Sequence, residues 1–124
     1  MLIEFPQMRE MVVEVVRTLS DIEYQQKMWV DERYQHPNLI EDLDENLSAL
    51  YDLTSVAECP HDYIGAVLVD IDEAEAMEAL HIAIEEFLGS VDGSLEDAVL
   101  IAMPGWRKVV DQAQATLRVL TRER

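Results

Sequence analysis

The sequence predicts an all-α fold of five or six short to medium amphipathic helices around one core, with one extended segment near residues 64–69. Three observations support this prediction. Apolar residues recur at spacings of three and four over most of the chain. Only four glycines and four prolines interrupt that pattern. A chain of 124 residues, 49% of them hydrophobic, is long enough for one sizeable core but short for two, so a single domain over residues 1–124 is expected.

The first half of the chain is expected to form three helices. Pro6 suits a first helical turn, and apolar residues continue to Leu19, with an outer face made of Arg9, Glu10, Glu14 and Arg17. The Ser-Asp-Ile-Glu run at residues 20–23 matches a capping box, which predicts a second helix as far as about Arg33. Pro37 breaks that helix, and Asn38 is expected to cap a third, with inner residues Ile40, Leu43, Leu47, Leu50, Tyr51 and Thr54.

Residues 56–71 have no helical period and contain Pro60 and Gly65, which predicts a loop and then an extended piece over residues 64–69. A lone strand cannot satisfy its own backbone polar groups. We therefore expect this piece to lie across the helices as irregular chain. The alternative is that it pairs with a second copy, which would make the protein a structural homo-oligomer, with a homodimer as the simplest case.

The second half of the chain is expected to form three further helices. Asp72 is expected to cap a fourth that ends at Gly89, with Met77, Leu80, Ile84, Phe87 and Leu88 inside and a wholly acidic outer face of Glu73, Glu75, Glu78, Glu85 and Glu86. Ser94 is expected to cap a short fifth helix that carries Leu95, Ala98, Val99 and Ala102 on its inner side. The last helix follows Pro104, with Trp106, Val110, Ala113, Leu117 and Leu120 inside and Arg107, Lys108, Arg118 and Arg122 outside.

The charge is strongly negative and unevenly distributed. The chain has 26 acidic residues against 9 lysines and arginines, which gives a formal net charge of −17. Between Tyr34 and Trp106 there are 17 acidic residues and no lysine or arginine. Self-repulsion disfavours binding to nucleic acid or an anionic membrane, and a basic partner is favoured. The alternative is an acidic surface that only keeps the protein soluble.

Targeting signals are absent from the sequence. The N-terminus lacks a basic leader, no apolar run reaches membrane-spanning length, and the single Cys59 cannot form an internal disulfide. A cytoplasmic location is expected.

Catalytic and metal-binding patterns are weak. Glu78 and His81 form a helical Glu-x-x-His pair of the kind found in dimetal helix bundles, but such a site needs a second copy. Cys59 and His61 are close in sequence, yet a small buried cysteine and a histidine on a loop surface are the expected roles. Phosphate-binding loops, serine elbows and zinc-type spacings are absent. We expect no enzymatic activity, no cofactor and no metal; a small enzyme or metal protein using Glu78 and His81 is the alternative.

The best binding candidates are aromatic and acidic. Tyrosine and tryptophan give large contact areas, and acids around them can steer a cationic partner. Trp29 falls on an inner helical stripe and is expected in the core, whereas Tyr34 and Tyr63 lie outside the stripes. The expected partner-binding residues are therefore Tyr34, Glu41, Asp42, Asp44, Glu45, Tyr63, Glu73, Glu75, Glu78, Glu85 and Glu86.

One combination of residues resembles a family. The series Trp29-Val30-x-x-Arg33-Tyr34, Asp42-Leu43-Asp44, Leu50-Tyr51-Asp52, Ile64-Gly65-x-Val67-Leu68 and Trp106 is similar to a family of short acidic proteins of unknown function, found mainly in Streptomyces-type actinobacteria and other bacteria. This resemblance implies no particular activity. In size, helicity and charge the chain also looks like the immunity proteins of bacterial toxin systems, which implies a partner with a basic nuclease cleft.

Overall fold

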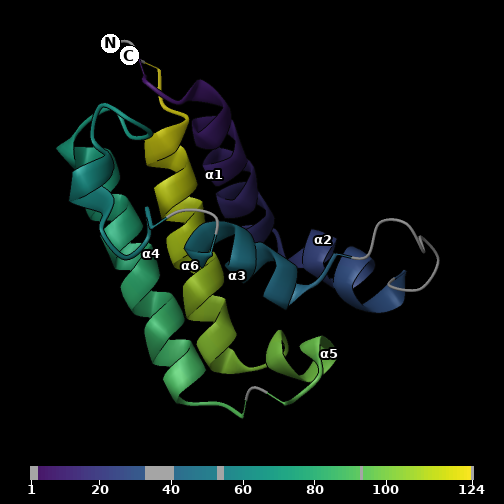
Figure 1. Cartoon of the computed structure of the whole chain (residues 1–124). Helices are drawn as coiled ribbons and strands as arrows, with labels where there is room; N and C mark the ends of the chain where they lie inside the picture. Colours follow the sequence, from purple (N-terminus) through teal and green to yellow (C-terminus); the bar gives the residue numbers. More distant parts are fainter. Residues whose placement is uncertain (1–2, 33–40, 53–54, 93, 124) are drawn as a thin grey trace.

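The computed structural model describes residues 3–32, 41–52, 55–92 and 94–123, and it confirms the all-α prediction. In this described part there are six α-helices and no strand (Figure 1). The helices are α1 (Pro6–Leu19), α2 (Ile22–Gln25), α3 (Leu43–Tyr51), α4 (Ile71–Gly89), α5 (Asp97–Leu100) and α6 (Pro104–Leu120). A π-helical segment, η1 (Gln26–Asp31), continues α2, and a 3-10 turn, η2 (Pro60–Tyr63), precedes α4. No helix in these ranges is both long and apolar enough to cross a membrane.

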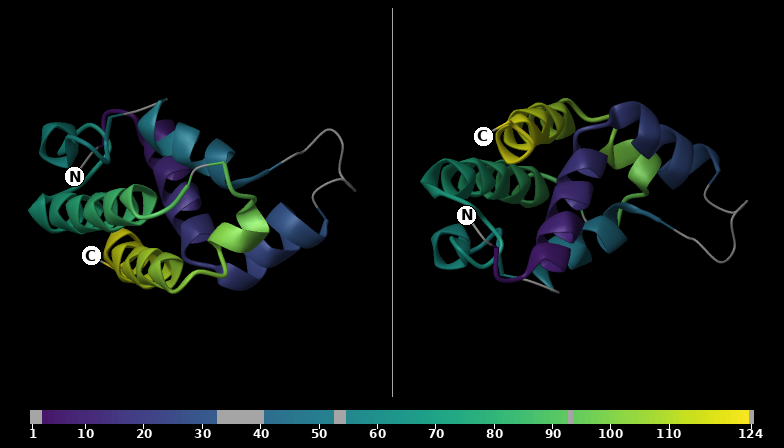
Figure 2. Two further views of the ribbon diagram at one scale, coloured as in Figure 1. Left: turned by 90° about the horizontal axis from the view of Figure 1, so that it is seen from below. Right: turned by 90° about the horizontal axis from the view of Figure 1, so that it is seen from above.

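The core lies around α6, which packs against both α1 and α4. The helices α4 and α6 run side by side and antiparallel, α1 packs on α6, and α3 packs on α1 (Figures 1 and 2). Two tryptophans lie together in the core: Trp29 and Trp106 are 1% exposed and their ring centroids are 6.3 Å apart. The Phe87 ring lies 5.2 Å from Trp106. The predicted burial of Trp29, Leu43, Leu50 and Trp106 is therefore confirmed.

Aspartates cap three helices, and each cap differs from the residue that the sequence suggested. Asp21 accepts a hydrogen bond from the Tyr24 N–H at the start of α2, while Ser20 is buried at the end of α1. Asp42 caps α3, not Asn38, which lies outside the described residues. Asp70 caps α4 two residues before the expected Asp72. The first N–H groups of a helix need an acceptor, and the side-chain oxygen of any of several nearby residues can supply it. The sequence alone therefore could not identify which residue caps each helix.

A buried ion pair corrects the assignment of two residues to outer faces. Arg9 is 20% exposed and Glu73 is 0% exposed at the side chain, and the guanidinium meets the carboxylate at 2.7 and 2.9 Å. Arg9 also donates to the carbonyls of Val67 and Leu120, and Glu73 accepts from the Val69 N–H. The pair thus joins the starts of α1 and α4 to the end of α6.

A buried glutamine joins α2 to the core. Gln25 is 0% exposed and its amide N–H donates to the Thr18 and Leu19 carbonyls. Its amide oxygen accepts a 2.8 Å hydrogen bond from Trp106 Nε1. Every polar atom of this side chain is therefore used, which satisfies the requirement for burying an amide.

The expected inner faces of two segments are partly wrong. In α5 the buried residue is Leu100, followed by Ile101, whereas Val99 is 46% exposed and Ala98 and Ala102 are also on the surface. Leu88, expected inside α4, is 38% exposed. The fifth helix is a single turn without a side-chain cap, so a stripe drawn over a longer helix did not apply.

Residues 64–69 are irregular chain beside the start of α1, as expected, but they form a turn and not the extended piece that the sequence predicted. A single bridge joins Ile64 to Leu68, and Gly65 has a φ of 92°, which favours glycine. The six N–H groups from Ile64 to Val69 all donate within the chain, and the Gly65 and Ala66 carbonyls accept from Glu4 and Phe5. These donors are already used, so the segment has no N–H row to offer a second copy.

Candidate protein-binding surface

The acids of α4 divide into a neutralised end and an unneutralised end. Near its first turn, Arg122 contacts Asp70 at 2.8 Å and Asp72 at 3.3 Å, and Arg9 neutralises Glu73. Farther along, Glu75, Glu78, Glu85 and Glu86 are all exposed. None of these four glutamates forms an ion pair with any residue that the structure describes. The unneutralised charge therefore lies on the part of α4 beyond its first turn.

Three of these glutamates form one line on the helix surface. Glu75, Glu78 and Glu85 are three and seven residues apart, so they lie along one side of α4; we call them the acidic stripe. Ile82 has the same helical spacing and is 50% exposed. The stripe thus combines charge with an exposed apolar side chain, which the sequence pattern did not indicate because Ile82 interrupts an acidic face.

A hollow of about 460 Å³ opens between α3 and α4. This α3–α4 groove is lined by Asp44, Leu47, Ser48, Tyr51, Asp52, Glu85 and Leu88. It brings together Asp44 and Glu85, two predicted binding residues that are far apart in sequence. The carboxylates of Asp44, Asp52 and Glu85 have no ion-pair partner within the described ranges, and Leu47, Tyr51 and Leu88 add apolar surface.

Tyr51 is held in this groove by a histidine of the opposite helix. Its hydroxyl lies 2.8 Å from Nδ1 of His81, and the two ring centroids are 5.5 Å apart. Burial, together with the negative charges of Glu85 and Glu58, raises the pKa of the Tyr51 hydroxyl. The phenol therefore stays protonated and fixed, and the same charges create a negative potential in the groove. Tyr51 is half-buried and packs against the core, in line with its place on the inner stripe, but that stripe did not reveal that it also lines the groove.

Two of the predicted binding acids have internal partners instead. Glu41 is half-buried and accepts hydrogen bonds from Trp29 Nε1 at 2.9 Å and from the Tyr24 hydroxyl at 3.1 Å. Burial, followed by the charge of Glu41, raises the pKa of Tyr24. Asp42 is the cap of α3. Glu41 and Asp42 therefore have structural roles. So does Glu73, which is buried, and its expected role as an outward acid is wrong.

The different roles of Asp42 and Asp44 give a stability prediction. Asp42→Ala removes a helix cap and is expected to lower the free energy of unfolding by about 1 kcal/mol. Asp44→Ala removes only an exposed first-turn charge and is expected to cost less than about 0.5 kcal/mol. Urea denaturation of the two variants checks this difference, and equal losses would contradict the assignment.

The remaining predicted residues lie apart from the groove. Tyr63 is half-buried in η2, and its hydroxyl accepts a 3.1 Å hydrogen bond from the Ser55 N–H. Glu86 lines a separate hollow of about 200 Å³ between α4 and α6 that also includes Lys108. Glu45 is exposed beside the groove without lining it. Tyr34 lies outside the described residues.

The two weak chemical patterns do not converge on a site. The Nδ1 atom of His81 faces Tyr51, Glu78 is exposed, and no group of three potential metal ligands occurs in the described ranges. Cys59 is exposed, so its expected burial is wrong, whereas the predicted exposure of His61 is confirmed.

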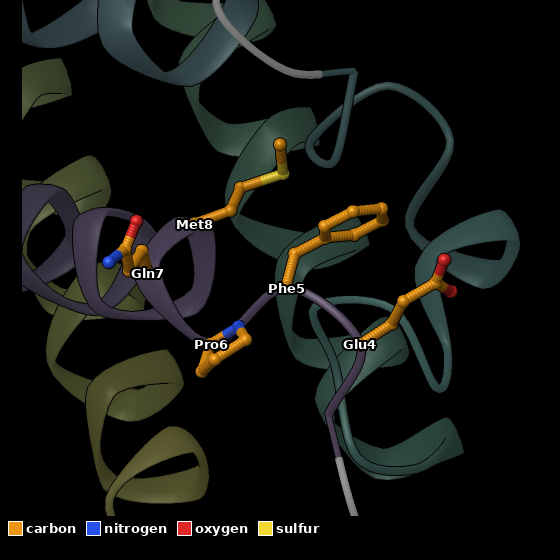
Figure 3. Close-up of a pocket in the computed structure, with 5 residues that line it drawn as sticks. All are labelled: Glu4, Phe5, Pro6, Gln7 and Met8. Atoms are coloured by element: carbon orange, nitrogen blue, oxygen red, sulfur yellow. The ribbon is translucent and has the colours of Figure 1, made fainter.

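A second hollow, of about 470 Å³, lies at the start of α1. It is lined by Glu4, Phe5, Pro6, Gln7 and Met8. Phe5 and Met8 point to the same side of the chain there, while Pro6 lies below them (Figure 3). The Phe5 side chain is 48% exposed. This hollow is mainly apolar and carries none of the unneutralised acids of α3 and α4, so we place the candidate site at the α3–α4 groove and the acidic stripe.

Comparison with known proteins gives a family for the chain. The model of a family described as "Domain of unknown function (DUF7945)" matches residues 3–124. The curated proteins and the solved structures give no match. Because the family model covers nearly the whole chain, as the resemblance to an uncharacterised family implied, this protein belongs to the DUF7945 family.

Proposed function

We propose that this protein is a non-enzymatic binding module that recognises a basic protein, as a bacterial immunity protein recognises a nuclease toxin. The partner's cationic, nucleic-acid-binding cleft would dock on the acidic stripe and the α3–α4 groove. The observation that carries the proposal is the set of exposed carboxylates on α3 and α4 that have no ion-pair partner among the described residues: Asp44, Glu45, Asp52, Glu75, Glu78, Glu85 and Glu86.

The distribution of cations supports this docking side. Arg107 and Lys108 are exposed on α6, and Arg17 is exposed on α1. By contrast, neither α3 nor α4 contains a lysine or arginine. A surface of one sign accelerates the encounter with a partner of the opposite sign and repels nucleic acid, which would compete for the same cleft. A cytoplasmic protein of this kind would protect the cell that makes the toxin.

Exposed apolar side chains add the contacts that charge alone does not give. Ile82 lies within the acidic stripe, and Leu88 lies in the groove. Protein interfaces place apolar anchors among polar residues, and the anchors supply much of the binding energy while charges set the rate of association.

The test is to measure binding to a basic protein encoded next to the gene. We expect a complex whose association rate at low ionic strength falls about fivefold to tenfold in the Glu75→Gln/Glu78→Gln variant, because steering depends on local charge. The matched control, Glu10→Gln/Glu23→Gln, removes two exposed carboxylates from α1 and α2 and is expected to change the rate less than about twofold.

Two results would contradict the proposal. One is the absence of a salt-sensitive complex with any basic neighbour. The other is an equal loss of association rate in the two double variants, which would indicate that only the net charge matters. In the toxin case, the complex is also expected to block nuclease activity, measured on a plasmid substrate.

A further inference from the structure

The α3–α4 groove has a chemical character that the acidic stripe lacks. Its acidic residues, Asp44, Asp52 and Glu85, lie in the same hollow as the side chains of Leu47, Tyr51 and Leu88. Asp44 and Asp52 are eight residues apart, so the groove follows α3 for about two helical turns, or about 12 Å. A ligand in the groove therefore meets apolar and aromatic surface as well as negative charge.

We infer that the α3–α4 groove receives an arginine side chain of the basic partner. This inference rests on the proposed function and adds the chemistry that the partner must present. The aliphatic stem of arginine matches Leu47, Tyr51 and Leu88, and its guanidinium matches the carboxylates. A guanidinium has five donors in a planar fork that pairs bidentately with a carboxylate, and it packs on aromatic faces, so it suits a carboxylate beside a tyrosine better than a lysine ammonium does.

The environment of Tyr51 supports this choice. The His81 contact fixes its ring, so little side-chain entropy is lost when a ligand packs on it. Burial, followed by the negative charges of Glu85 and Glu58, raises the pKa of its hydroxyl, and Glu85 lines the same groove. A fixed aromatic ring in a negative field is the arrangement that attracts a cation to its face.

The experiment is a titration of the full chain with Nα-acetyl-arginine N-methylamide, followed by amide chemical shifts in two-dimensional NMR spectra. The matching lysine compound is titrated at the same ionic strength. We expect saturable shifts centred on Leu47, Tyr51 and Leu88, with a dissociation constant of about 1 to 10 mM, because a small ligand makes few contacts. The lysine compound is expected to bind about fivefold more weakly, since its ammonium can neither pair bidentately with a carboxylate nor stack as a plane on the Tyr51 ring.

Two double variants separate the groove from general charge. Asp44→Asn/Glu85→Gln removes two groove carboxylates and is expected to weaken arginine binding about tenfold, because each lost charged hydrogen bond is worth several-fold in affinity. Glu10→Gln/Glu23→Gln removes two exposed carboxylates of α1 and α2, outside the candidate site, and is expected to weaken binding less than about twofold. Tyr51→Phe keeps the ring and is expected to retain the preference for arginine.

Three results would overturn the inference. They are no saturable shift up to about 50 mM probe, shifts spread equally over all acidic residues, and lysine binding as tight as arginine binding. None of these results bears on whether a basic neighbour forms a complex. Conversely, the arginine compound could bind in the groove while no basic neighbouring protein forms a complex. That pair of results would support the arginine site and contradict the proposed function.

Discussion

Replacing Arg9 with alanine is expected to lower the free energy of unfolding by about 3 to 5 kcal/mol, the cost of breaking a buried ion pair. The variant leaves the Glu73 carboxylate, 0% exposed, without its bidentate guanidinium. It also removes donors from the Val67 and Leu120 carbonyls. Domains of this size have total stabilities of about 5 to 15 kcal/mol, so urea denaturation followed by tryptophan fluorescence should show a large shift.

Arg17→Ala is the matched control for this prediction. Arg17 lies on the same helix and pairs with Glu14 at 3.3 Å, but both side chains are more than half exposed, so its loss is expected to cost less than about 1 kcal/mol. The double variant Arg9→Met/Glu73→Met leaves no buried charge and is expected to recover part of the stability lost in Arg9→Ala. Equal losses in Arg9→Ala and Arg17→Ala would show that the buried pair is no more important than a surface pair.

The helices could be predicted from sequence because apolar spacing records which side of a helix is buried. The pattern gave the span of α1, the end of α4 at Gly89 and the start of α6 at Pro104. It could not reveal that Arg9 and Glu73 are inside, because a charged residue one position from an apolar stripe looks the same whether it faces water or a buried partner. That distinction depends on a pairing across 64 residues of sequence.

The candidate site was predicted in part. Asp44 and Glu85 were selected as outward acids, and the structure places both in one groove. Tyr51 and Leu88 were assigned to core stripes, because periodicity cannot tell the edge of a buried face from its centre. Glu41 was selected as a surface acid, although the Trp29 indole N–H binds it. A buried indole N–H needs an acceptor, so the indole of Trp29 was the signal that one nearby polar residue would be structural.

Gln25→Leu is expected to destabilise the fold by about 3 kcal/mol, the second largest effect among these predictions. Leucine nearly fills the volume of glutamine, so the loss reports hydrogen bonds rather than a cavity. The Trp106 N–H would lose its 2.8 Å acceptor and the Leu19 carbonyl would lose its amide donor, each in a setting where unpaired groups cost about 1 to 3 kcal/mol, whereas the Thr18 carbonyl keeps a hydrogen bond from the Asp21 N–H. Urea denaturation provides the measurement.

The neighbouring Gln26→Leu variant is the control, because Gln26 is exposed and, among the described residues, its side chain bonds only to the exposed Asp31; a change of less than about 0.5 kcal/mol is expected. Trp106→Phe completes a double-mutant cycle, since it removes the N–H that Gln25 accepts. The double variant Gln25→Leu/Trp106→Phe is expected to cost at least about 1 kcal/mol less than the sum of the two single variants, because no donor is left unpaired. Additivity within about 0.5 kcal/mol would mean that the hydrogen bond does not join α2 to α6 energetically.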